Sequence, residues 1–179
     1  MNIELLFEAQ ERYESKIKER FHQDKDKNFL FNLKLALLVE LGEFANNWRG
    51  FKFWSADKKP KTKGIKEENG VKVEYDPLLE EFVDCLHFIL SLSINSGNKE
   101  YVLRILKNTR FEKDESEDLV INFIRLYNVA VDGIDIHNLV KMFKLLMNIG
   151  LRLGYSLDDI EKAYYKKNKD NVNRQLNGY

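Results

Sequence analysis

The sequence predicts an all-α protein, a bundle of helices with one small β-hairpin. Apolar residues recur at helical spacing along almost the whole chain. Only two prolines and nine glycines interrupt its 179 residues, which favours long helices. With 44% apolar residues the chain is long enough for one sizeable core, so we expect residues 1–179 to form a single domain.

Seven helical segments follow from the spacing of the apolar residues. Residues 3–20 carry Leu6, Ala9, Tyr13 and Ile17 at helical intervals, and residues 29–48 form a strong amphipathic pattern. Residues 77–96 are apolar on nearly every side, which predicts a buried central helix. Further helices are expected at 99–109, 116–129, 136–153 and 157–176, the last with Ser156 as its N-cap.

Residues 55–76 break the helical pattern because they are polar, rich in lysine and contain a proline. Within them, residues 65–73 alternate around Asn69-Gly70, a dipeptide that favours a type I′ hairpin turn. We therefore expect a loop with a small hairpin between two core helices. This loop could be a lid over a site, although a solvated connector is the more common role of such a segment.

The charge balance and the cysteine content exclude several classes of protein. Basic and acidic residues number 29 each, and a chain without net charge is not built to coat a nucleic acid polymer. Cys85 is the single cysteine, so no internal disulfide can form. The first residues lack the features of a signal peptide, and no apolar run is long enough to span a membrane. We expect a soluble cytoplasmic protein.

Two glutamates stand on the apolar side of the predicted helix at 29–48. Glu40 and Glu43 are three positions apart, a spacing that turns them by only about 60° and separates them by about 4.5 Å along the axis. The same side carries Leu33, Leu37 and Phe44. Glu40 is therefore expected inside the apolar stripe and not on the solvated face.

The predicted helix at 77–96 repeats this arrangement. Glu81 and Asp84 share the three-residue spacing, and Glu81 lies in line with Phe88 and other apolar residues further along. Glu80 neighbours Asp84 at a spacing of four, so the spacing alone does not decide whether Glu80 or Glu81 joins Asp84.

Carboxylates on core-facing sides require a compensating positive charge, because desolvation costs several kcal/mol for each ion. Residues 77–96 contain no lysine or arginine, and residues 29–48 contain only Lys34, which points away from the acids. A divalent cation with oxygen ligands, Mg²⁺ in particular, is the favoured solution. A network of ion pairs with lysines or arginines from elsewhere in the chain is the alternative.

Four segments carry a resemblance to a known enzyme family. They are residues 40–46 (ELGEFAN), 49–55 (RGFKFWS), 80–88 (EEFVDCLHF) and 167–179 (KNKDNVNRQLNGY). Together with Gln10 in the first helix, they resemble the dimeric dUTPase family, within the MazG-like superfamily of all-α nucleoside triphosphate pyrophosphohydrolases. The match runs from the first helix to the last residue.

The resemblance implies an all-helical homodimer that depends on Mg²⁺, converts dUTP to dUMP and pyrophosphate, and also acts on dUDP. It implies that Glu40, Glu43, Glu81 and Asp84 are the metal ligands. It places Gln10, Trp54, His87 and Asn171 around the deoxyuridine, and Lys167 and Arg174 at the phosphates.

The residues themselves leave several roles open. Lys167, Asn171 and Arg174 share one helical face, which could meet phosphates or simply be solvated. His87 could bind a ligand or be a satisfied core residue, and Trp54 could stack on a base or close the core beneath the loop. Either Glu40 or Glu43 could take the proton from a metal-activated water.

Two other functions fit parts of the sequence. One is a related pyrophosphohydrolase that acts on another nucleotide such as dCTP. The other is a non-enzymatic helical dimer that holds a metal only as a structural element. The sequence by itself does not reveal the shape of the base pocket on which this choice depends.

Overall fold

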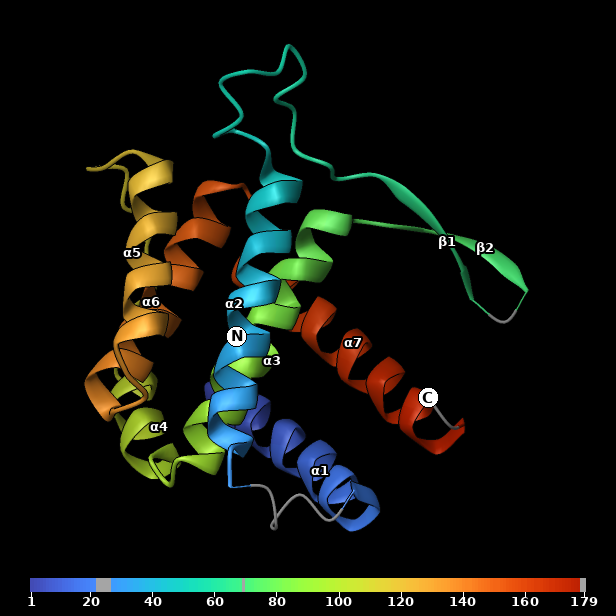
Figure 1. Ribbon diagram of the computed structural model, residues 1–179, viewed down its shortest axis with the longest axis vertical. Coiled ribbons are helices and arrows are strands. Elements are labelled where there is room, and N and C mark those ends of the chain that lie inside the picture. The colour runs from blue at the N-terminus through green and yellow to red at the C-terminus, as the bar shows by residue number, and fades with distance from the viewer. Residues whose placement is uncertain (22–26, 69, 178–179) are drawn as a thin grey trace.

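The computed structural model describes residues 1–21, 27–68 and 70–177 and confirms the all-α fold with one small hairpin (Figure 1). The helices are α1 (Ile3–Phe21), α2 (Phe29–Trp48), α3 (Pro77–Asn95), α4 (Lys99–Lys107), α5 (Leu119–Asp132), α6 (Ile136–Arg152) and α7 (Leu157–Asn177). The strands are β1 (Gly64–Glu68) and β2 (Val71–Tyr75). Each helix begins and ends within a few residues of its predicted bounds.

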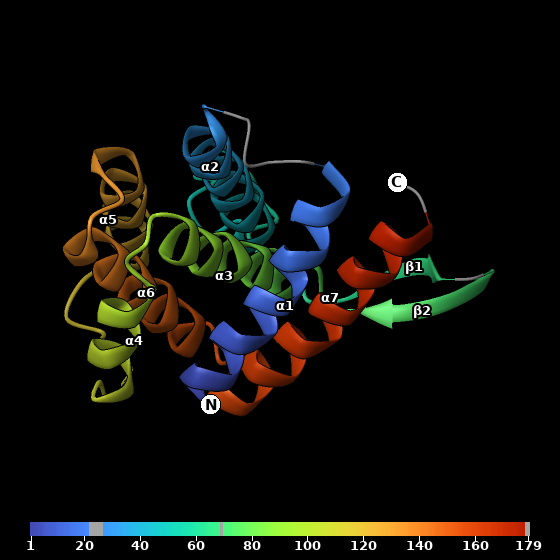
Figure 2. The same cartoon turned by 90° about the horizontal axis from the view of Figure 1, so that it is seen from below.

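Helix α3 is the centre of the bundle (Figure 2). It starts with Pro77 in its first turn, and the Asp76 side chain caps it by accepting a hydrogen bond from the Leu79 amide at 3.0 Å. Most of its side chains are buried, including Phe82 and Leu90, because α1, α2, α4, α6 and α7 all pack against it. The prediction of a buried central helix at 77–96 is confirmed.

The other helices form pairs around α3. Helix α2 lies along α3 with Leu37, Leu41 and Phe44 fully buried, α1 packs beside α7, and α5 packs beside α6. Among the described helices, none combines the length and the apolar character that crossing a membrane requires. The arrangement brings residues from both ends of the chain, on α1 and α7, next to the central helix.

Side-chain caps determine where two of the later helices begin. Ser156 Oγ accepts a hydrogen bond from the Asp159 amide at 3.1 Å, and the Asp159 carboxylate accepts one from the Ser156 amide at 2.9 Å, so the predicted N-cap is confirmed. Helix α5 begins at Leu119 and not at residue 116, because Asp118 caps it by accepting from the Val120 amide at 2.7 Å.

The hairpin projects from one end of the bundle (Figure 1). Its strands pair in antiparallel register from Gly64 opposite Tyr75 to Glu68 opposite Val71, so the predicted hairpin is confirmed. Gly70 has a φ of 78°, as a tight turn requires, while Asn69, on which the predicted turn type also depends, lies outside the described residues.

Helices α3 and α6 approach closely at a glycine. A Cβ atom on Gly150 of α6 would lie 2.6 Å from the ring of Phe82 on α3 and 3.3 Å from Ile160. Phe82 is fully buried, so its ring has little room to move away. Gly150 therefore permits the close packing of α6 on the central helix.

We expect Gly150→Ala to destabilise the protein by about 1 kcal/mol, because overpacking of about 1–3 kcal/mol outweighs the gain in helix propensity of about 1 kcal/mol. Urea unfolding followed by circular dichroism measures the change. In a Phe82→Leu background the same substitution should become neutral or stabilising, since the smaller side chain leaves space for the methyl group. A stabilising effect in the wild-type background would contradict the predicted close contact.

Candidate active site

The packing of α2 along α3 brings three of the predicted metal ligands together. One carboxylate oxygen from each of Glu40, Glu43 and Glu81 lies within 4.8 Å of the other two. Glu40 and Glu81 are half-buried, whereas Glu43 is exposed. Sequence reasoning placed this acidic side in the core, but the structure places it at the edge of the core, because the turn from Glu40 to Glu43 carries Glu43 toward solvent.

Burial and the crowding of carboxylates raise the pKa of Glu40 and of Glu81. Burial, followed by repulsion from Asp84 and Glu43, raises the pKa of Glu40 to about 7. Burial and the neighbouring carboxylates, Asp84 first, likewise raise the pKa of Glu81 to about 7. Within the described part of the chain, no lysine or arginine forms a salt bridge with Glu40, Glu43 or Glu81. This set of converging oxygens without a paired cation fits a hard divalent cation.

Asp84, the fourth predicted ligand, lies beside this cluster and pairs with a lysine. Lys167 of α7 places its Nζ atom 2.6 Å from the Asp84 carboxylate and 2.9 Å from the Glu80 carboxylate. Glu80 also pairs with Lys66 of the hairpin at 3.2 Å. Burial tends to raise the pKa of Glu80, but its two lysine contacts outweigh burial and lower it. The predicted alternative, a network of ion pairs, therefore applies to Glu80 and Asp84, whereas Glu40, Glu43 and Glu81 have no lysine or arginine partner among the described residues.

Glu80 and Glu81 thus have different surroundings. Their spacing from Asp84 in the sequence could not decide which of the two joins the carboxylate cluster. Glu81 belongs to the carboxylate cluster, whereas Glu80 forms ion pairs with Lys66 and Lys167. The Asn47 side chain donates a hydrogen bond to Glu81 at 3.2 Å and so orients that carboxylate. Asn47 was not predicted as a site residue, although its spacings of seven from Glu40 and four from Glu43 put it on the same helical face.

A cavity of about 360 Å³ extends from the acidic cluster between α1, α2, α3 and α7. Seven of the predicted site residues line it: Gln10, Glu40, Asp84, His87, Lys167, Asn171 and Arg174. One end is charged, with Glu40, Asp84, Lys167 and Arg174. The other end contains Gln10 and His87 with apolar and aromatic neighbours such as Phe29 and Phe88. The cavity lining therefore combines a group of charged side chains with a group of amide, imidazole and apolar side chains.

His87 and Gln10 form a buried polar pair at the less charged end. His87 Nδ1 lies 2.7 Å from Gln10 Oε1, and the hydroxyl of buried Tyr164 lies 2.9 Å from the same oxygen. The Tyr164 ring stacks on the His87 ring with a centroid separation of 4.4 Å. Burial, and then the positive charge of Lys167, lower the pKa of His87 to about 3. The imidazole is therefore neutral at physiological pH.

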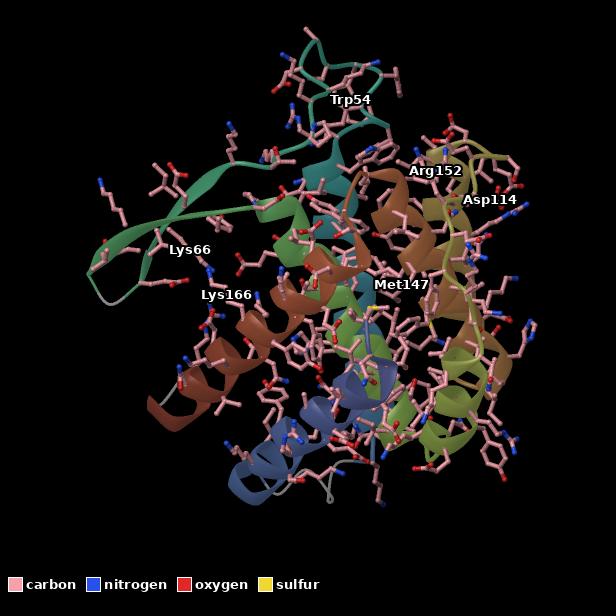
Figure 3. The ribbon with its side chains drawn as sticks, turned by 180° about the vertical axis from the view of Figure 1, so that it is seen from behind. Trp54, Lys66, Asp114, Met147, Arg152 and Lys166 are labelled. Carbon is pink, nitrogen blue, oxygen red and sulfur yellow. The ribbon has the colours of Figure 1, made fainter. Side chains whose placement is uncertain are left out.

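Three predicted site residues do not line this cavity: Glu43 and Glu81, which lie beside Glu40 in the acidic cluster, and Trp54, which is remote from the cluster. Trp54 lies in the loop after α2, where its ring is 64% exposed and packs edge-on against the rings of Phe51 and Phe53 (Figure 3). The end of the C-terminal motif is also not placed, because Gly178, Tyr179 and the Gln175 side chain lie outside the described residues.

A comparison of the sequence with models of known protein families supports the resemblance that these site residues carry. A family model described as dUTPase matches residues 2–70 and 69–179. No curated protein matches the chain significantly. The two matched segments include both acidic helices, the hairpin and the C-terminal helix, and leave only the first residue uncovered. On this evidence the chain belongs to the all-α dUTPase family, a family of dUTP diphosphatases.

Proposed function

We propose that this single domain hydrolyses dUTP to dUMP and pyrophosphate with Mg²⁺, and dUDP to dUMP and phosphate, in the cavity between α1, α2, α3 and α7. The observation that carries the proposal is the convergence of the Glu40, Glu43 and Glu81 oxygens, a cluster that meets that cavity at Glu40. The family is one of enzymes, so a purely structural role for these acids is not retained.

The charged end would hold the metal and the phosphates. Glu40, Glu43, Glu81 and Asp84 would ligate Mg²⁺, which when bound neutralises phosphate charge and lowers the pKa of a water molecule. Lys167 and Arg174 line the same end and supply positive charge toward the phosphate chain. Of the two candidates for the general base, Glu40 is favoured because it lines the cavity, while Glu43 lies toward solvent.

The less charged end would hold the deoxyuridine. Gln10 and His87 offer hydrogen bonds there, and Phe29 and Phe88 offer apolar surface to a ring. Asn171 also lines the cavity, one helical turn beyond Lys167 on α7. Stacking of the base on Trp54 stays a prediction, because Trp54 does not line this cavity.

We also propose that the protein is a homodimer. Helix α2 exposes Phe31, Leu35 and Val39, which are 70%, 63% and 51% exposed and form one face because they are spaced by four. Helix α5, which packs beside α2, exposes Ile121 and Ile124 as well. Such a continuous apolar face is costly in a monomer, and a second copy of the same face could cover it.

A nucleotide panel tests the activity. With Mg²⁺ we expect release of pyrophosphate from dUTP and of phosphate from dUDP, with much slower turnover of dCTP. Glu40→Gln should lower kcat/KM by about a hundredfold or more, because it removes both a ligand and the proposed base. Glu100→Gln, a change at an exposed carboxylate on α4, should leave the rate unchanged. No turnover of dUTP or dUDP by the wild-type protein would overturn the proposed function.

Thermal unfolding at pH 8 tests the metal site without any substrate. In EDTA, Glu81→Gln should raise the melting temperature, because it removes one of several mutually repelling carboxylates. Adding Mg²⁺ should raise the melting temperature of the wild type and change that of the variant much less. Equal Mg²⁺ responses in the two proteins would place the metal elsewhere.

Sedimentation velocity tests the dimer. The double change Leu35→Glu and Val39→Glu should convert the protein to a monomer, because it puts four like charges at the centre of a two-fold interface. Ile65→Glu introduces a charge at an equally exposed apolar residue of the hairpin and should leave the dimer intact. A monomeric wild-type protein at micromolar concentration would refute the proposal.

A further inference from the structure

The less charged end of the cavity contains a carboxylate that the proposed mechanism does not use. Glu14 of α1 lines the cavity and is only 7% exposed. Its oxygens accept hydrogen bonds from Gln10 Nε2 at 3.4 Å and from the Asn95 side-chain amide. In the described part of the chain no lysine or arginine pairs with it, so its partners are neutral amide groups.

The charge on Glu14 determines which way the Gln10 side chain faces. A carboxylate only accepts hydrogen bonds, so the Gln10 atom nearest to it must be the amide nitrogen. That nitrogen also donates to Ser91 Oγ at 2.8 Å. The opposite orientation would set the Gln10 oxygen against the Glu14 oxygen, with no cation between them. Gln10 Oε1 is therefore directed toward His87 and Tyr164.

The orientation of Gln10 in turn determines the tautomer of His87. Gln10 Oε1 can only accept, so the His87 Nδ1 atom 2.7 Å away must carry the ring proton. Because the imidazole is neutral, Nε2 is then a bare acceptor. This atom is buried and has no hydrogen-bond partner among the described residues. A lone buried acceptor is less costly than a lone buried N–H donor, which agrees with this tautomer.

We propose that Glu14 is a positioning residue for base recognition: through Gln10 it holds His87 as a hydrogen-bond acceptor in the cavity, so that the site selects a pyrimidine base with a hydrogen on ring nitrogen N3. The inference rests on the proposed function, since it assumes that the base lies at this end of the cavity. Uracil carries a hydrogen on N3 and can donate to His87 Nε2. Cytosine has a bare N3 and would oppose one acceptor with another.

The same polarity does not separate uracil from thymine, because both carry a hydrogen on N3. Rejection of thymine must come from the space around its methyl group. Glu14 should thus affect the choice between dUTP and dCTP and leave the choice between dUTP and dTTP unchanged. This difference distinguishes a defined hydrogen-bonding role from a general loosening of the pocket.

The first experiment uses the protein without nucleotide or metal. Nitrogen-15 NMR of the histidine rings, with the His87 signal assigned by its loss in His87→Gln, reports which ring nitrogen carries the proton. We expect the proton on Nδ1 in the wild type and a shift of the population toward Nε2 in Glu14→Gln. A wild-type ring protonated on Nε2 would overturn the inference whatever the variant does.

The second experiment compares kcat/KM for dUTP, dCTP and dTTP. Glu14→Gln should lower the preference for dUTP over dCTP by about tenfold or more, since it permits the side-chain amide of Gln10 to rotate by about 180° and exchange its oxygen and nitrogen. Glu8→Gln, on the exposed side of the same helix, is the matched control and should change nothing.

The outcomes separate the inference from the proposed function. If the wild type hydrolyses dUTP but Glu14→Gln keeps both the tautomer and the dUTP preference, the role of Glu14 is refuted while the function stands. If the wild type turns over neither dUTP nor dUDP, the proposed function fails, and the proposed role in base selection fails with it. If Glu14→Gln does not fold, the His87 tautomer of the wild type still tests the inference, because a proton on Nε2 would contradict the proposed hydrogen bonds between Glu14, Gln10 and His87.

Discussion

Repulsion among carboxylates at the edge of an apolar core is the constraint around which this protein is arranged. Glu40 and Glu43 of α2 face Glu81 and Asp84 of α3, and burial together with mutual repulsion raises the pKa of Glu40 and of Glu81 to about 7. Two helices packed along each other hold these groups close, so the repulsion cannot be relieved by moving apart. A site of this kind is poised for a divalent cation and for the phosphates that accompany it.

The fold separates this charge from a second, less charged group of residues that lines the same cavity. Lys167 stands at the border, where it pairs with Asp84 and Glu80 and also lowers the pKa of His87. Beyond it, His87, Gln10 and Tyr164 form a buried hydrogen-bonded network, which the Glu14 carboxylate joins as an acceptor. A strongly charged end and a less charged end in one cavity match the two halves of a nucleotide, whose phosphates are charged and whose base is not.

The hairpin is connected to this arrangement by a row of ion pairs. Lys66 of β1 pairs with Glu80, which pairs with Lys167, which pairs with Asp84. Salt bridges that are partly exposed contribute little to stability on their own. Their effect here is geometric, because they hold Glu80 away from the carboxylate cluster and leave Glu81 to join it.

The sequence by itself determined the helices, the hairpin and the acidic pairs, because helical and strand periodicity are local properties of the chain. It also predicted that α3 is central, since a helix that is apolar on nearly every side can only be buried. Only the tertiary structure decided that Glu81 and not Glu80 joins Glu40 and Glu43, and that Lys167 reaches Asp84 from a helix more than eighty residues away. It also brought Glu14 and His87 into hydrogen-bonding distance of Gln10 and placed Trp54 off the cavity. These contacts depend on how α1, α3 and α7 pack together, and no spacing along one helix contains that information.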